Sequence, residues 1–172
     1  MRLLLSRQAS PIGEMLLVTD ERLTLRALDF HDYEARMHKL LTRHYGAYQL
    51  VDATTPQTIA AALDDYFAGT LEAVDDLPTQ TGGTDFQTAT WKLLRAIPAS
   101  ETRTYGDLAR QLNKPSASRA VGLANGANPI AIVVPCHRVI GASGALTGYG
   151  GGLSRKRWLL DHERKHAATV AV

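Results

Sequence analysis

Cys136 is the only cysteine of the chain, and His137 follows it within the run Ile132-Val133-Val134-Pro135-Cys136-His137-Arg138-Val139-Ile140. A free thiol has an ordinary pKa of about 8.5 and reacts as the thiolate, so a reactive cysteine needs a base that takes its proton. The His137 imidazole can act as that base, directly or through one water molecule. The alternative is that the two side chains only pack in a core. One cysteine excludes an internal disulfide and a thiolate zinc cluster.

Glu163 is the candidate for the group that orients this histidine. It follows Leu159 and Leu160 by four and three residues, so it shares their face of a predicted helix. A carboxylate on an apolar helix face is costly unless it is paired. Two interpretations therefore stand: Glu163 fixes the His137 ring, or it is solvated at a helix end.

The elements that must position these residues are predicted to be helical throughout residues 84–166. Three of the helices begin at capping residues, Thr84 with Gln87, Thr104 with Asp107, and Ser116. The helices are expected over residues 85–97, 104–112, 116–125 and 154–165. A short helix, a tight turn and a second helix predict a helix-turn-helix over residues 104–125.

The first half of the chain predicts a small α+β unit. Strands are expected over residues 2–5, 14–19 and 23–30, and helices over residues 32–45 and from Pro56 to a stop at Gly69. A polar stretch over residues 78–83 then separates the halves. The expected fold class is α+β, with domains at 1–80 and 81–166 and a flexible tail at 167–172.

The third predicted helix of the second half carries small residues almost throughout. Arg119 is its one long polar side chain, whereas helices that read the major groove carry several. Small residues allow close approach, which suits either the narrow minor groove of DNA or packing against another helix. Arg119 stands where a core would not accept it, and this favours DNA.

Charge is divided unevenly between the halves. Residues 1–83 hold 7 Lys/Arg and 12 Asp/Glu, a net charge of −5, while residues 84–172 hold 12 and 5, a net charge of +7. A basic half favours a polyanionic partner, although a chance division of surface charge is the alternative. The composition, 45% hydrophobic and 21% charged, is that of a globular protein. We expect neither a signal peptide nor a membrane span, and a cytoplasmic location.

The motif Pro135-Cys136-His137-Arg138-Val139 resembles the acceptor site of the O6-alkylguanine-DNA alkyltransferases, also called methylated-DNA–protein-cysteine methyltransferases. The resemblance extends over residues 83–163 and includes the blocks 104–109, 118–122, 127–129 and 148–153. Residues 1–80 resemble the N-terminal domain of bacterial members more loosely. The resemblance implies a ribonuclease H-like first domain and a winged-helix-like second domain.

The family resemblance also implies a role for each matching residue. Cys136 would accept the alkyl group irreversibly, His137 would deprotonate it through a water, and Glu163 would orient the imidazole. Asn128 would brace the turn that holds the cysteine. Tyr105 would press on the target phosphate and bond the flipped guanine.

The remaining implied roles concern DNA and the substrate base. Arg119 would fill the gap left by the flipped base, and the other expected DNA contacts are Ala117, Ser118, Gly122 and Asn125. The loop with Tyr149, Gly150 and Gly151 would cover the guanine. Backbone carbonyls at Cys136 and Val139, with Pro135 beside them, would complete the base site.

The chain departs from the family in two places. Many members have serine where Gly150 stands. Some members hold zinc through cysteines of the first domain, which this chain lacks, and His31, His38 and His44 are predicted to be surface residues rather than metal ligands. No metal or organic cofactor is expected, and the partner would be duplex DNA bound by a monomer. Two rival functions are a binding-only relative, which would lack the acceptor cysteine, and a cysteine hydrolase that ignores DNA.

Overall fold

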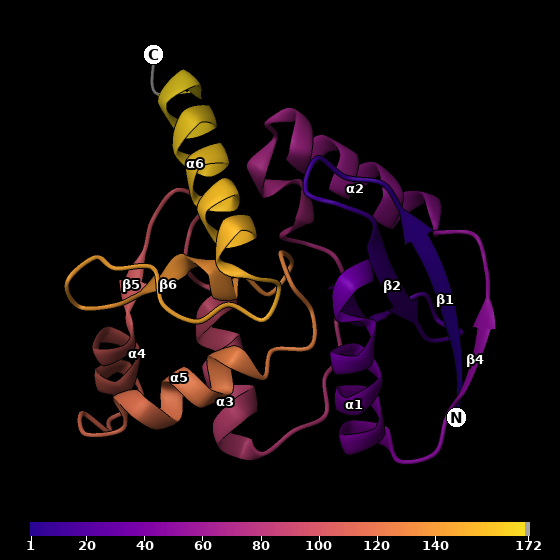
Figure 1. Cartoon of the computed structure of the whole chain (residues 1–172), viewed down its shortest axis with the longest axis horizontal. Helices are drawn as coiled ribbons and strands as arrows, with labels where there is room; N and C mark the ends of the chain where they lie inside the picture. The colour runs from indigo at the N-terminus through magenta and orange to yellow at the C-terminus, as the bar shows by residue number, and fades with distance from the viewer. Residues whose placement is uncertain (171–172) are drawn as a thin grey trace. The chain divides into compact units, whose positions relative to one another are not determined.

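The computed structural model describes residues 1–170, with side chains as far as residue 167. Its backbone forms two compact units, and Figure 1 shows the elements of each. The first unit contains residues 1–83 together with 129–133, and the second contains residues 84–128 and 134 onward. The predicted α+β class is confirmed. The return of residues 129–133 to the first unit was not predicted, because no local pattern marks such a crossing.

The first unit is built on a four-stranded sheet of order β3-β2-β1-β4. Strands β1 (Arg2–Gln8), β2 (Met15–Thr19) and β3 (Leu25–Phe30) pair antiparallel, and β4 (Gln49–Asp52) pairs parallel to β1. Strand β4 was not predicted, since it is only four residues long and its side chains are exposed or half-buried. Leu28 of β3 exchanges backbone hydrogen bonds of 3.0 Å with Pro129 and Ala131, which attaches the returning segment to this unit.

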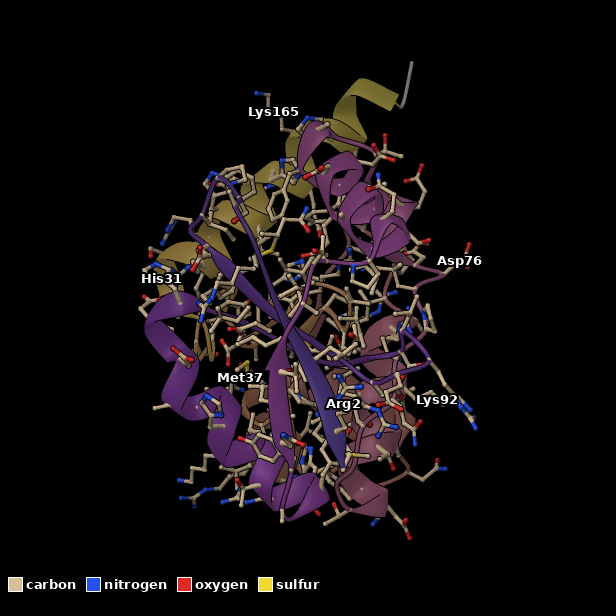
Figure 2. The ribbon with its side chains drawn as sticks, turned by 90° about the vertical axis from the view of Figure 1, so that its right-hand side faces the viewer. Arg2, His31, Met37, Asp76, Lys92 and Lys165 are labelled. Carbon is tan, nitrogen blue, oxygen red and sulfur yellow. The ribbon has the colours of Figure 1, made fainter. Side chains whose placement is uncertain are left out.

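Helices cover the sheet of the first unit on both sides. Figure 2 shows α1 (Glu34–Tyr45) on one side of β1 and α2 (Gln57–Ala68) on the other. Met37 and Leu41 of α1 pack against alternate residues of the strands, namely Leu3, Leu5, Leu16, Val18 and Ala27. Gly69 ends α2 in the left-handed conformation with φ of 119°, as predicted. Two short 3₁₀ helices, His31–Tyr33 and Leu71–Val74, complete this unit.

His31, His38 and His44 were predicted to be surface residues, and the structure shows this fully for only one of them. His31 is exposed, but His38 and His44 are half-buried. His38 Nδ1 lies 2.6 Å from the Tyr48 hydroxyl, and the two rings stack. Within the described part of the chain, no group of three or more histidine, cysteine or acidic side chains is arranged to bind a metal ion.

The second unit is mostly helical. It contains α3 (Asp85–Arg95), α4 (Tyr105–Gln111), α5 (Ser118–Gly126) and α6 (Leu153–Val170). The capping boxes predicted for Thr84 with Gln87 and for Thr104 with Asp107 are both confirmed. The expectation of helix alone is wrong, because β5 (Arg103–Thr104) pairs parallel with β6 (Val139–Ile140). These strands are too short to leave an alternating pattern in the sequence.

Two helix ends also differ from prediction. Helix α5 begins at Ser118, and its preceding residue is Ala117 with no side-chain cap, so Ser116 does not cap it. Helix α6 continues beyond the predicted end at Lys165 to Val170, which makes the first part of the predicted tail helical. Residues 171 and 172 of that tail lie outside the described residues. Among the described residues, no helix has the length and apolar character required to cross a membrane.

Candidate active site

The cysteine stands at the first position of a short 3₁₀ helix, Cys136–Arg138, and is only 5% exposed. The Cys136 N–H donates to the Val134 carbonyl at 2.8 Å across Pro135, whose φ of −81° and ψ of 67° define an inverse γ-turn. The Asn128 amide donates to the same Val134 carbonyl at 2.7 Å. The turn that presents the thiol is therefore fixed by a buried side chain as well as by its own backbone.

His137 and Glu163 form a fully buried pair, 2.7 Å apart from Nε2 to Oε2. A carboxylate is an acceptor, so the imidazole carries its proton on Nε2 and the lone pair is on Nδ1. Within the described residues, Nδ1 is buried and accepts no protein hydrogen bond. The pair therefore leaves a basic nitrogen available in the next residue after the thiol.

Arg138 is the third buried member of this group, and the sequence reasoning missed it. Its Nε and Nη2 lie 2.9 Å from the two carboxylate oxygens of Glu163, and its Nη1 donates to the Ile97 carbonyl at 2.7 Å. Glu163 also accepts from the Ser100 N–H at 3.3 Å. An arginine inside the apolar run 132–140 was the signal, because a buried guanidinium requires an acidic partner.

The charges of this cluster set the protonation states. Burial lowers the pKa of His137, the positive charges of Arg138 and Lys156 lower it further, and Glu163 only partly opposes them. Burial raises the pKa of Glu163, but its contacts with His137 and Arg138 outweigh burial and hold that pKa well below its usual range. Because Arg138 neutralises the carboxylate, the state that we expect is a neutral His137 beside an ionised Glu163.

Tyr105 connects helix α4, helix α5 and the loop 141–152. Its hydroxyl donates to the Thr147 carbonyl at 3.2 Å and accepts from the Thr147 hydroxyl at 3.1 Å. A Cβ placed on Gly122 of α5 would lie 3.7 Å from the Tyr105 ring, which leaves room for little more than a methyl group. Helix α5 is supported from behind by Trp91, whose indole N–H donates to the Ala124 carbonyl at 2.8 Å.

The residues of the α5 region that are expected to contact DNA differ in exposure. Arg119 is exposed, and Ala117, Ser118 and Gly122 are half-buried. Asn125 is only 3% exposed, and its amide donates to the Cys136 carbonyl at 3.3 Å. The Asn125 side chain therefore braces the cysteine from within the unit, and a contact of this residue with DNA stays a prediction.

The expected substrate residues come from the loop and from the cysteine segment. Tyr149 and Gly150 are half-buried and Gly151 is buried, while Gly148 and Gly152 have φ of 38° and 95°. Such positive φ values favour glycine. Pro135 and Val139 are buried, so they offer backbone groups rather than exposed side chains. The Val139 carbonyl already accepts from Lys156 Nζ at 2.5 Å, a contact that was not predicted.

A helix-turn-helix together with a buried Cys-His-Glu group is typical of a DNA-binding protein with a nucleophilic cysteine. Comparison with known proteins identifies the family. Residues 85–165 match the 6-O-methylguanine DNA methyltransferase, DNA binding domain, and residues 5–81 match the ribonuclease-like domain of the same family. The chain belongs to the 6-O-methylguanine DNA methyltransferase family. This confirms the resemblance drawn from the acceptor motif.

Individual relatives cover nearly the whole chain. The methylated-DNA–protein-cysteine methyltransferase of Salmonella typhimurium is 54% identical over 165 residues, which cover 95% of this chain and 96% of the relative. A crystal structure of Mycobacterium tuberculosis OGT in complex with DNA is 43% identical with a TM-score of 0.80, over 95% of this chain and 94% of that one. The O6-methylguanine-DNA methyltransferase of Pyrococcus kodakaraensis is 25% identical, with a TM-score of 0.69, over 94% and 98%.

Proposed function

We propose that the chain repairs DNA by moving the alkyl group of an O6-alkylguanine onto Cys136, once for each protein molecule. The observation that carries the proposal is the buried contact between His137 and Glu163, which leaves Nδ1 of the neutral imidazole as a base in the residue that follows Cys136. A neutral base is required, because an imidazolium could not accept the thiol proton. A cytoplasmic location fits this function.

The transfer begins when Nδ1 of His137 takes the thiol proton, directly or through one water. The Cys136 thiolate then attacks the alkyl carbon in line with the carbon–O6 bond. A sulfur–carbon bond forms, the carbon–O6 bond breaks, and its electron pair stays on the guanine oxygen. The leaving base takes a proton, for which the Tyr105 hydroxyl is the candidate donor. The ionised Glu163 stabilises the resulting imidazolium.

The thioether product explains why each molecule acts once. A thioether is not cleaved by a thiol or by hydrolysis under cellular conditions, because a thiolate is a poor leaving group from an alkyl carbon, and the chain has no second cysteine. Attack on O6-alkylguanine also needs the base outside the stack, because the alkyl carbon is inaccessible in a closed duplex. Arg119, exposed on α5, is the candidate for the side chain that occupies the gap.

The test is incubation of the protein with duplex DNA that carries one radiolabelled O6-methylguanine. We expect one label per protein, a mass increase of one methyl group, and its location on the peptide that contains Cys136. Cys136→Ala should bind the same duplex and take no label. Release of label over many substrate equivalents would instead identify a hydrolase, and binding without transfer by the parent would identify a protein that only recognises damage.

A further inference from the structure

Lys156 of α6 is completely buried, yet the proposed transfer assigns it no role. Its ammonium donates to backbone carbonyls, at 2.5 Å to Val139, 2.8 Å to Thr147 and 3.5 Å to Gly148. Burying an ammonium is expensive, and three carbonyl dipoles offset only part of that cost. A packed apolar side chain would fill this position at lower cost if the position served packing alone.

The three carbonyls belong to two separate segments of the second unit. Val139 lies in β6, three residues after the acceptor cysteine, whereas Thr147 and Gly148 lie in the loop 141–152 that is expected to cover the base. Near its end, the loop is also held by Arg155, whose guanidinium donates to the Gly151 carbonyl at 2.9 Å. Its internal turns close between Gly141 and Ala145 and between Tyr149 and Gly152, which leaves residues 146–148 outside both turns. Lys156 binds this intervening part.

Thr147 is a hydrogen-bond partner of both Lys156 and Tyr105. The Thr147 carbonyl accepts from Lys156 and also from the hydroxyl of Tyr105, the candidate proton donor. A shift of Thr147 would therefore move the hydroxyl partner of Tyr105 as well. The buried ammonium thus binds the loop and β6 directly, and it affects the position of the Tyr105 hydroxyl through Thr147.

The charge of the Cys136 thiolate also acts on the Lys156 ammonium. Burial lowers the pKa of Lys156 to about 8, and attraction to the charge of the Cys136 thiolate partly opposes this shift. The hydrogen bonds of the ammonium join Val139, three residues after the acceptor cysteine, to Thr147 and Gly148 of the loop.

We propose that Lys156 is a positioning residue that fastens residues 146–148 of the loop to the cysteine-bearing strand and so sets the geometry of the base pocket. The proposal rests on the proposed function, because the loop matters only if a base occupies the pocket. Removing the ammonium should leave the loop free to move away from Val139. Misplacement by about 1 Å in a reacting site can cost roughly 10²-fold in rate, so a large loss of transfer is expected.

The test compares the full-length parent with Lys156→Met, Lys156→Arg and a control, Arg157→Met, whose residue is exposed on the same helix. Amide hydrogen exchange is measured by mass spectrometry for peptides of residues 141–152 and of α5 and α6. The single-turnover rate of methyl transfer from an O6-methylguanine duplex is measured over a range of DNA concentrations. We expect Lys156→Met to exchange faster in the loop alone, to transfer about 10²-fold more slowly, and to bind the duplex as the parent does.

Lys156→Arg should recover part of both the protection and the rate, since a guanidinium can still donate to carbonyls, and Arg157→Met should match the parent. Slow transfer with unchanged loop exchange would overturn the proposal, because Lys156 would then act only on the thiolate. Faster exchange throughout α5 and α6 would also overturn it, because Lys156 would then support the whole unit. If Lys156→Met does not fold, Lys156→Arg gives the same comparison of loop and helices. A parent that transfers no methyl group refutes the proposed function, whereas the exchange data still decide whether Lys156 fastens the loop.

Discussion

Arg138 contacts both carboxylate oxygens of Glu163, each at 2.9 Å, and both side chains are almost completely buried. The pair is therefore a buried bidentate ion pair inside the second unit, formed between the cysteine segment and helix α6. The same carboxylate binds His137, so a single acidic group orients the candidate base and neutralises the guanidinium. A change at Glu163 should therefore affect both the stability of the fold and the orientation of the candidate base.

We predict that Arg138→Leu destabilises the protein severely. Removing one partner of a buried ion pair leaves the other charge uncompensated, which typically costs about 3–5 kcal/mol in the free energy of unfolding. Urea unfolding measures the change, and Arg157→Leu on the exposed face of α6 should change it by no more than about 0.5 kcal/mol. The double variant Arg138→Leu with Glu163→Leu should lose less than the two single losses combined. Additive losses would show that the two residues act independently.

We predict that His137→Ala and Glu163→Gln slow methyl transfer much more than they weaken DNA binding. Loss of a positioned general base costs about 10²–10⁴-fold in rate. Single-turnover transfer and duplex binding by fluorescence anisotropy separate the two effects. Glu163→Gln should have the smaller effect on rate, because an amide can still accept from the imidazole N–H. Transfer at the parent rate in both variants would refute the base assignment.

The pH dependence of stability follows from the lowered pKa of His137. In the pH range below about 6.5, the ordinary pKa of a histidine, the unfolded chain takes up a proton on this residue, while the buried imidazole resists protonation. The folded state therefore binds fewer protons, and the free energy of unfolding falls as the pH falls through this window, by at most about 1.4 kcal/mol per pH unit from this group. Glu163, whose pKa is also lowered, adds its own loss only as the pH falls further. Urea unfolding of the parent and of His137→Gln at pH 7, 6 and 5 should show a shallower decline in the variant. Parallel declines would mean that His137 is not protected from protonation.

Much of this arrangement could be predicted from the sequence, and the parts that could not have physical reasons. Helices α3 and α4 begin at capping boxes, whose residues lie three positions apart and are visible locally. The contact of His137 with Glu163 joins residues 26 positions apart. The apolar face of α6 made Glu163 a candidate, and the family resemblance implied its role. Strands β5 and β6 have two residues each and leave no pattern. The buried roles of Asn125 and Lys156 depend on which carbonyls other segments bring to them, and no local pattern encodes that.

We predict that Arg119→Ala impairs repair of duplex DNA but not reaction with a free base. Arg119 is exposed on α5, and no contact of its side chain within the described residues suggests a part in the pocket. A residue that only stabilises the opened duplex should leave the rate with free O6-benzylguanine unchanged within about twofold. The duplex rate should fall by about tenfold or more, because unstacking a base costs a few kcal/mol and Arg119 would offset part of that cost. Ala120→Ser on the same exposed face is the matched control. Equal losses on both substrates would place Arg119 in the pocket or the fold.

The last prediction concerns the size of the alkyl group that the loop admits. Gly148 and Gly152 have backbone conformations that favour glycine, but Gly150 does not, and it is half-buried at the part of the loop expected to cover the base. Without a side chain at Gly150 the pocket should have space beside O6, so we expect the parent to accept benzyl as well as methyl groups. Gly150→Trp is preferable as a test to a change at Gly151, which is buried and would disturb packing.

Ordering a glycine-rich loop costs about 1–2 kcal/mol per residue, but this cost is common to all substrates and should not change the preference between them. A tryptophan at position 150 should instead act on size, with a selective loss of rate for the benzyl substrate. Second-order rate constants for methyl and benzyl substrates, measured in the parent and in Gly150→Trp, give the preference directly. Gly150→Ser, which adds only a hydroxymethyl group, is the control and should keep the parent preference. A parent that rejects benzyl would show that another wall of the pocket sets the limit, and an equal loss for both substrates in Gly150→Trp would show that the substitution disturbs the loop rather than filling the space beside O6.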